Sequence, residues 1–308
     1  MTATTTIPYQ AARPARSRRP FIGGALLLPA VVFLAVFLVL PSLVLLAYSV
    51  MTPQQGGGMG LPLHLTSYER LLSDPTYQQV ILRTLRIALI TSALTMALAY
   101  PLAMAIAYGH PTFSRIVILM VVMPLLVSVL VRTYGWQVLL ANGKTGAINW
   151  FLSDMGVQGV MIKLLYTEWA VVIASVHVFL PLMVLPIASS LSRIDPSLTH
   201  AARILGASSW RAFRLVTFPL SLPGLAAGLA IVFSLTASSY ITPAMIGGRT
   251  GAMLGNLLEQ QMTTVYDWSM GGAIAVVMVS ISLVVNVAIN RMVDRRVRSM
   301  SSAAGAAK

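Results

Sequence analysis

Hydrophobic residues in this 308-residue chain gather into long runs, and most polar residues lie in the stretches between them. A helix that spans a bilayer needs about 20 mostly apolar residues, and six runs reach that length. The runs cover residues 22–50, 87–108, 116–140, 169–191, 215–246 and 269–290. We therefore predict an all-α membrane protein with six transmembrane helices. Prolines such as Pro101, Pro181 and Pro223 lie inside the runs and predict bent helices.

The composition agrees with lipid as the solvent, since 57% of the residues are hydrophobic and only 9% are charged. The first run is longer than the core of a signal peptide and no small-residue cleavage site follows it, so we expect it to stay as a helix. The chain has no cysteine, which excludes disulfides, a thiolate nucleophile and cysteine-ligated metals. No histidine cluster has the spacing of a metal site, and no metal or other cofactor is expected on this chain.

Positive charge is concentrated on one side of the predicted topology. Together with both termini, the loops 109–115 and 190–214 hold 14 Lys and Arg against Asp195 and Asp294, which leaves +12 of the formal net charge of +13. Cytoplasmic loops carry such an excess of Lys and Arg, so we assign this side and both termini to the cytoplasm. Topology therefore explains the high pI, and binding of nucleic acid is not expected.

The predicted domain organisation follows from these spans. A basic N-terminal tail (1–20) precedes a transmembrane domain (21–291), and a second basic tail (292–308) ends the chain. The largest cytoplasmic loop (192–219) joins the fourth and fifth spans.

This loop has the signals of two short helices. Asp195 followed by Pro196 predicts a helix start, because aspartate caps the first turn and proline fits its first position. Gly206 predicts the helix end, at a positive φ that only glycine adopts readily. Ser208 then predicts the cap of a second helix. The first helix presents an apolar stripe made of Leu198, Ala201, Ala202 and Leu205.

Two interpretations of the loop are open. It could be a connector whose arginines face water or anionic lipid headgroups. A rigid pair of capped helices with a small-residue face favours a second interpretation, docking into a cleft of a cytoplasmic partner, where arginines donate hydrogen bonds. The residues assigned to that contact are His200, Ala201, Ala202, Arg203, Gly206, Ala207, Trp210, Arg211, Phe213 and Pro219.

Residue order in this loop resembles the "EAA" loop of permease subunits of binding-protein-dependent ABC importers. That signature is E-A-A, three residues, G, nine residues, then I-x-L-P. The chain has His200-Ala201-Ala202, Gly206 and Val216-Thr217-Phe218-Pro219 at the same spacing. Other stretches, such as "TSYERLLSDPTYQQVILRTLRIALI" and "GNLLEQQMTTVYDWSMGGAIA", are similar to the spermidine/putrescine branch, and to its PotB-type subunit in particular.

The resemblance implies a type I importer permease in a bacterial inner membrane, with no enzymatic activity of its own. It implies a second permease subunit, expected as a heterodimer partner, a cytoplasmic ATPase dimer that binds ATP and Mg, and an extracytoplasmic substrate-binding protein. The loop would form the coupling helices that rest on the ATPase. One residue departs from the family: His200 replaces the glutamate, and a histidine cannot supply a permanent negative charge.

A substrate path is expected where the spans meet the outer half of the bilayer. The candidates are Arg132, Tyr134, Trp136, His177, Tyr240, Thr242, Glu259 and Asp267. Interfacial aromatic belts look the same in sequence, and His177 could equally make a helix–helix hydrogen bond. Carboxylates are missing from the six apolar cores, so a polyamine substrate is allowed but not required.

Alternative functions remain open at this point. The same machinery could import an amino acid derivative or an opine. An ion-coupled secondary carrier is a further class, but it usually needs buried acids and internal repeats, and neither is visible. The G-K-T within Asn142–Thr145 lacks the first glycine of a phosphate loop, so we interpret it as a turn.

Cysteine labelling tests the topology in a chain that has no native cysteine. A membrane-impermeant maleimide added outside is expected to label Gly57→Cys and Gly146→Cys and to spare Ser17→Cys and Ala304→Cys. The opposite labelling pattern would mean that the positive-inside assignment is inverted.

Overall fold

The computed structural model describes residues 20–53, 59–143, 146–156 and 161–305. Most of the predicted N-terminal tail, the second half of the predicted turn at Asn142–Thr145 and the last three residues lie outside this part of the chain. The described residues are mostly helical, which confirms the predicted all-α class.

The chain divides into two units, Met1–Leu45 and Leu46–Lys308. In the first unit, α1 (Pro20–Leu34) continues through one π-helical turn, η1 (Ala35–Val39), into α2 (Leu40–Tyr48), which ends in the second unit. The apolar stretch Leu27–Tyr48, which runs through these three elements, is long enough to cross a membrane.

The second unit begins with a small antiparallel pair, β1 (Met51–Pro53) and β2 (Met59–Leu63), followed by α3 (Thr66–Ser73). The hydroxyls of Ser67 and Ser269 lie 2.9 Å apart, so α3 is tied to the start of the last helix.

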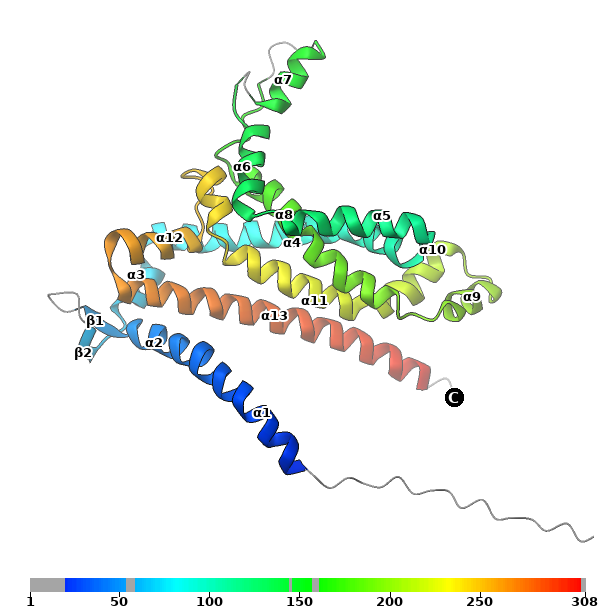
Figure 1. Ribbon diagram of the computed structural model, residues 1–308, viewed down its shortest axis with the longest axis horizontal. Coiled ribbons are helices and arrows are strands. Elements are labelled where there is room, and N and C mark those ends of the chain that lie inside the picture. The colour runs from blue at the N-terminus through cyan, green and yellow to red at the C-terminus, as the bar shows by residue number, and fades with distance from the viewer. Residues whose placement is uncertain (1–19, 54–58, 144–145, 157–160, 306–308) are drawn as a thin grey trace, which may run out of the picture. The chain divides into compact units, whose positions relative to one another are not determined.

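Four long helices make up most of the second unit: α4 (Pro75–Tyr108), α8 (Glu168–Leu191), α11 (Phe218–Ala237) and α13 (Trp268–Gly305). The first three pack against one another, and α13 lies along α11 (Figure 1). The connecting elements are α5 (Pro111–Val122), η2 (Met123–Leu126), α6 (Val129–Leu139), α7 (Ala147–Asp154), α9 (Pro196–Ile204), α10 (Ser209–Ala212), η3 (Phe213–Thr217), η4 (Pro243–Gly247), α12 (Leu254–Gln260) and η5 (Gln261–Val265).

Small residues set the contact between α8 and α11. A Cβ atom added at Gly224 would stand 2.5 Å from the carbonyl oxygen of Pro186, and one added at Gly228 would stand 2.7 Å from the sulfur of Met183. The backbones therefore approach as closely as glycine permits, which is how small-xxx-small faces associate helices in membranes. The surrounding core is apolar and includes the fully buried Ile187 and Val232.

The predicted third span, 116–140, is broken into two helices near Pro124, in line with the bends that prolines inside the apolar runs predict. The chain forms α5, the 3₁₀ turn η2 and then α6, and the two helices meet at 101°. Pro124 lies inside η2, and Val127 and Ser128 are extended, so the helical hydrogen bonds stop between the two pieces. The described residues thus hold five helices able to span a membrane, or six if this bent pair is one span.

Other predicted bounds also shift. The second span begins at Pro75 rather than 87, because Asp74 caps it by accepting a 2.8 Å hydrogen bond from the backbone of Thr76. The fifth span was predicted to reach residue 246, but its regular helix ends at Ala237, and a break in the helix separates it from η4. The last helix continues past 290 to Gly305.

Candidate coupling and translocation sites

The helix pair of the loop at 195–219 forms as its capping residues predict. The carboxylate of Asp195 accepts a 2.8 Å hydrogen bond from the backbone N–H of Ser197, and Pro196 is the first residue of α9. This hydrogen bond lowers the pKa of Asp195 below its ordinary value, because it stabilises the charged carboxylate. The cap is therefore ionised at neutral pH.

A rigid turn ends α9. Gly206 has φ +86, its N–H bonds the carbonyl of Arg203 at 2.9 Å, and the N–H of Ala207 bonds the carbonyl of Ala202 at 3.0 Å. This pair of bonds is the Schellman motif, in which glycine supplies the left-handed residue. The predicted positive φ at Gly206 is confirmed.

The second helix is anchored at one side and exposed at the other. Ser208 accepts from the backbone N–H of Arg211 at 3.3 Å, and the guanidinium of Arg203 donates to Ser209 at 3.2 Å. Trp210 and Phe213 stack with ring centroids 5.3 Å apart.

Phe213 faces inward, and its ring meets that of Tyr100 on α4 edge-on at 5.7 Å. In contrast, 68% of Trp210, 86% of Ile204 and 87% of Leu205 is exposed. These three are the most exposed of the large apolar residues in the loop, ahead of Leu215 and Leu198. Of the predicted stripe, Leu198, Ala201 and Leu205 are exposed and Ala202 is half-buried.

A pocket of about 560 Å³ lies beneath the loop. His200, Arg203 and Phe213 line it together with Tyr108 at the end of α4. The histidine that replaces the family glutamate thus faces a space between the loop and the long helices. Arg211 is exposed, and Pro219 stands at the start of α11.

A second group of predicted residues meets where α6 crosses α8. The indole N–H of Trp136 donates to Nδ1 of His177 at 3.2 Å, so the proton of a neutral His177 is on Nε2. Arg132 donates to the carbonyl of Val178 at 3.3 Å. Pro181 lies in the same stretch of α8, where its missing N–H opens the helical hydrogen-bond ladder.

Thr242 joins this group through the hydroxyl of Thr133, which lies 3.4 Å from its own. Tyr134 and Tyr240 are exposed at 62% and 49%. The two predicted acids make local bonds instead: Glu259 accepts from Thr263 at 3.0 Å, and Asp267 caps α13 at the backbone N–H of Met270 at 2.9 Å.

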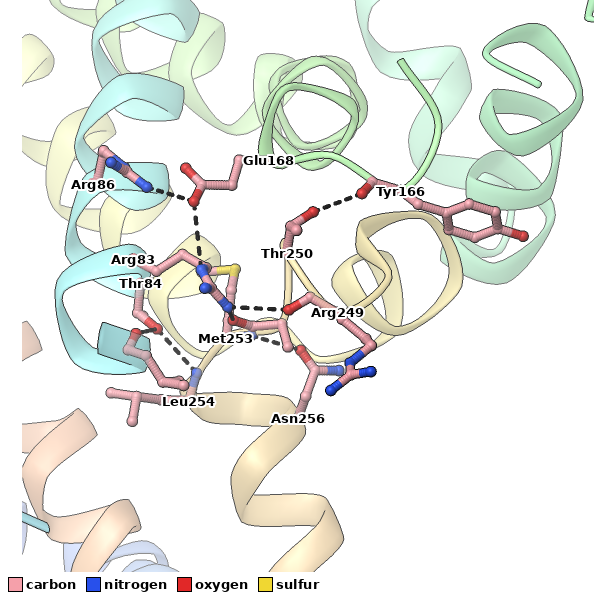
Figure 2. Close-up of polar contacts among 12 residues, drawn as sticks. Arg83, Thr84, Arg86, Tyr166, Glu168, Arg249, Thr250, Met253, Leu254 and Asn256 are labelled. Carbon is pink, nitrogen blue, oxygen red and sulfur yellow. Dashed lines mark hydrogen bonds and ion pairs between the residues drawn. The ribbon is translucent and has the colours of Figure 1, made fainter. Parts of the chain in front are cut away.

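A polar network that the sequence did not predict surrounds Glu168 (Figure 2). One carboxylate oxygen of Glu168 is paired with Arg86 and lies 3.4 Å from Nε of Arg83. Arg83 also donates to the carbonyls of Arg249 and Ala252, both at 3.3 Å. The network joins α4, α8 and the segment before α12.

Two further hydrogen bonds hold this segment. The hydroxyl of Thr84 accepts from the backbone of Leu254 at 2.9 Å, and that of Thr250 donates to the carbonyl of Tyr166 at 2.7 Å. Tyr166 has φ +66, which is rare for a side chain of its size and marks local strain. Arg83 and Arg86, three residues apart and so on one side of α4, are a sequence signal that could have indicated this network.

Comparison with known proteins identifies the class. Residues 99–299 match the family described as binding-protein-dependent transport system inner membrane component. The chain is 30% identical to the spermidine/putrescine transport system permease protein PotB of Haemophilus influenzae, over 86% of this chain and 93% of the relative. PotB of Escherichia coli is also 30% identical, over 86% and 96%.

More distant similarities agree. A putative 2-aminoethylphosphonate transport system permease of Salmonella typhimurium is 26% identical over 88% of this chain and 91% of its own length. A chain of a bacterial ABC transporter that imports alginate has a TM-score of 0.70 at 18% identity, covering 89% of this chain and 95% of the other. That likeness supports the fold.

The chain therefore belongs to the family of binding-protein-dependent inner membrane permeases and has the type I fold. It is a permease subunit of an ABC importer, a multi-pass membrane component without enzymatic activity.

The network at Glu168 predicts unequal roles for its two arginines. Arg83→Ala removes a side chain that is 19% exposed and bonds two carbonyls, so we expect a loss of about 2–3 kcal/mol in stability. Arg86→Ala removes a side chain that is 60% exposed and should cost less than about 1 kcal/mol. Thermal unfolding in lipid nanodiscs measures both, and equal losses would contradict the assignment.

Proposed function

We propose that this chain forms half of the translocation pathway of an ATP-driven importer and that the loop at 195–219 couples it to a cytoplasmic ATPase. The observation that carries the proposal is the rigid, capped helix pair that exposes Ile204, Leu205 and Trp210. Large apolar side chains held on a fixed frame form the anchors of a protein interface. A connector facing water or lipid headgroups has no need of this arrangement.

The loop is also mechanically linked to the spans. Phe213 packs on Tyr100, and the hydroxyl of Tyr100 lies 2.8 Å from that of Ser221 on α11. Movement of the loop is thereby transmitted to α4 and α11. In this mechanism ATP and Mg bind to the ATPase dimer, and the loop of this chain passes the motion of the ATPase to α4 and α11.

The remaining partners follow from the class of protein. A second permease, expected as a heterodimer partner, completes the pathway, and an extracytoplasmic binding protein delivers the solute. Both termini and the coupling loop face the cytoplasm in this proposal, because the Lys and Arg excess lies on that side.

The group at the crossing of α6 and α8 is proposed to line the pathway. Arg132, Trp136 and His177 present polar and aromatic atoms within a membrane-spanning region, where ionisable residues mark substrate paths. Tyr134 and Tyr240 are exposed and are proposed to contact the solute or to form the outer gate.

The substrate class has two candidates. The names of the PotB relatives support a polyamine. The charges favour a second candidate, a small amine that also carries an anionic group, such as an amino acid derivative: Glu168 is already paired with two arginines, and Arg132 is a cation in the proposed pathway. The similarity to a putative 2-aminoethylphosphonate permease agrees with this candidate.

Gly206→Val tests the coupling assignment. The added side chain at φ +86 costs about 1–2 kcal/mol and should tilt α10, so stimulation of hydrolysis by the loaded binding protein should fall about tenfold. Gly143→Val is the matched control, since Gly143 has φ +89 and open space around it but lies outside the loop. Membrane level and binding-protein docking should match the wild type in both variants. Full stimulation in Gly206→Val would leave the loop as a simple connector.

Arg132→Gln distinguishes the two substrate classes. An anion-bearing solute should be transported about tenfold more slowly, because its partner charge is lost. A polyamine should be transported as well as before or faster, because a repelling charge is removed. The assay is uptake into proteoliposomes with the binding protein. Arg132→Lys keeps the charge and serves as the control.

The same uptake assay tests Tyr134 and Tyr240. If Tyr134→Ala and Tyr240→Ala both leave the transport rate unchanged, the two aromatic residues do not belong to the pathway.

A further inference from the structure

A large pocket lies between η3–α11 and α13, separate from the pocket under the coupling loop. Its volume is about 930 Å³. Three arginines line it, Arg214 from η3 and Arg295 and Arg296 from α13. In the ribbon, α13 runs alongside α11 toward the end that carries α9 and α10 (Figure 1).

The pocket is polar at one end and apolar at the other. Arg214 precedes Leu222 by eight residues on a continuous helical stretch, which corresponds to about 12 Å along the axis. The apolar wall of the pocket lies beyond Arg214 along the helix. It is formed by Leu215, Phe218 and Leu222, with Met292 from α13. A basic rim above an apolar wall matches the headgroup and upper acyl chain of a phospholipid.

The charge of the lining is all of one sign. None of the residues that line the pocket is acidic, and the nearest acid in sequence, Asp294, is exposed on α13 and is not part of the lining. Guanidinium groups bind phosphate oxygens through paired hydrogen bonds. A lining of this kind is complementary to an anionic group.

We propose that this pocket binds one anionic phospholipid. Arg214 and Arg295 hold its phosphate, and the wall of Phe218 and Leu222 holds the beginning of an acyl chain. The lipid thereby bridges η3 and α13 at the point where the coupling loop enters the membrane. This site contains none of the residues proposed for the substrate pathway. It shares the segment 214–219, including Pro219, with the proposed coupling loop, but not the exposed Ile204, Leu205 and Trp210.

Native mass spectrometry of the full-length chain with added phosphatidylglycerol tests the proposal. We expect one phosphatidylglycerol to bind in preference to phosphatidylcholine. The double variant Arg214→Gln/Arg295→Gln should bind it about 30-fold more weakly, since each arginine near an anionic headgroup contributes about fivefold. Arg115→Gln is the matched control, because Arg115 is an exposed arginine on the same side of the predicted topology and does not line the pocket.

Three results would overturn the proposal. Equal binding of both lipids would mean that the arginines do not select a headgroup. If Arg115→Gln lost as much phosphatidylglycerol binding as the double variant, general surface charge would explain the binding. Displacement of the lipid by inorganic phosphate alone would make this a site for free anions. The charge-keeping variant Arg214→Lys/Arg295→Lys controls for misfolding and should retain most of the binding. None of these measurements depends on ATPase coupling, so they stand apart from the Gly206 test.

Discussion

The close contact between α8 and α11 is the constraint on which the rest of the second unit depends. No side chain fits at Gly224, where the backbone of α11 reaches the carbonyl of Pro186. In hydrocarbon there is little hydrophobic force between helices, so close van der Waals packing holds them. This contact fixes α8, which carries Glu168 and His177, and α11, which extends from the coupling loop toward the network at Arg83.

The arginines at the two ends of the helix bundle differ in how their charges are neutralised. At one end, Glu168 neutralises Arg83 and Arg86, and Arg83 satisfies two backbone carbonyls. Such an arrangement ties three segments without leaving a buried charge alone. At the other end, Arg214 and Arg295 line a pocket that has no acidic residue among its described lining, and the phosphate of an anionic lipid is the proposed counter-charge.

The coupling loop is stiff because its backbone groups are satisfied locally. Asp195 and Ser208 cap the two helices, and the turn at Gly206 satisfies carbonyls at the end of α9. A frame of this kind can hold Trp210 outward while Phe213 stays packed on Tyr100. His200 changes the charge at the family's glutamate position but leaves this frame intact, since the frame uses other residues.

The sequence alone determined the features that depend on neighbours in the chain. Apolar runs predicted the membrane-spanning helices, and the caps at Asp195 and Ser208 and the positive φ of Gly206 followed from bonds between residues two to five apart. Tertiary structure decided the rest. The proline in the third run indicated a bend, but the angle of 101° and the position at Val127–Ser128 came from the fold. Trp136 meets His177 across 41 residues, and Arg83 reaches Ala252 across 169. Hydrophobic periodicity records which residues avoid water, but it does not record which polar groups meet once the helices have packed.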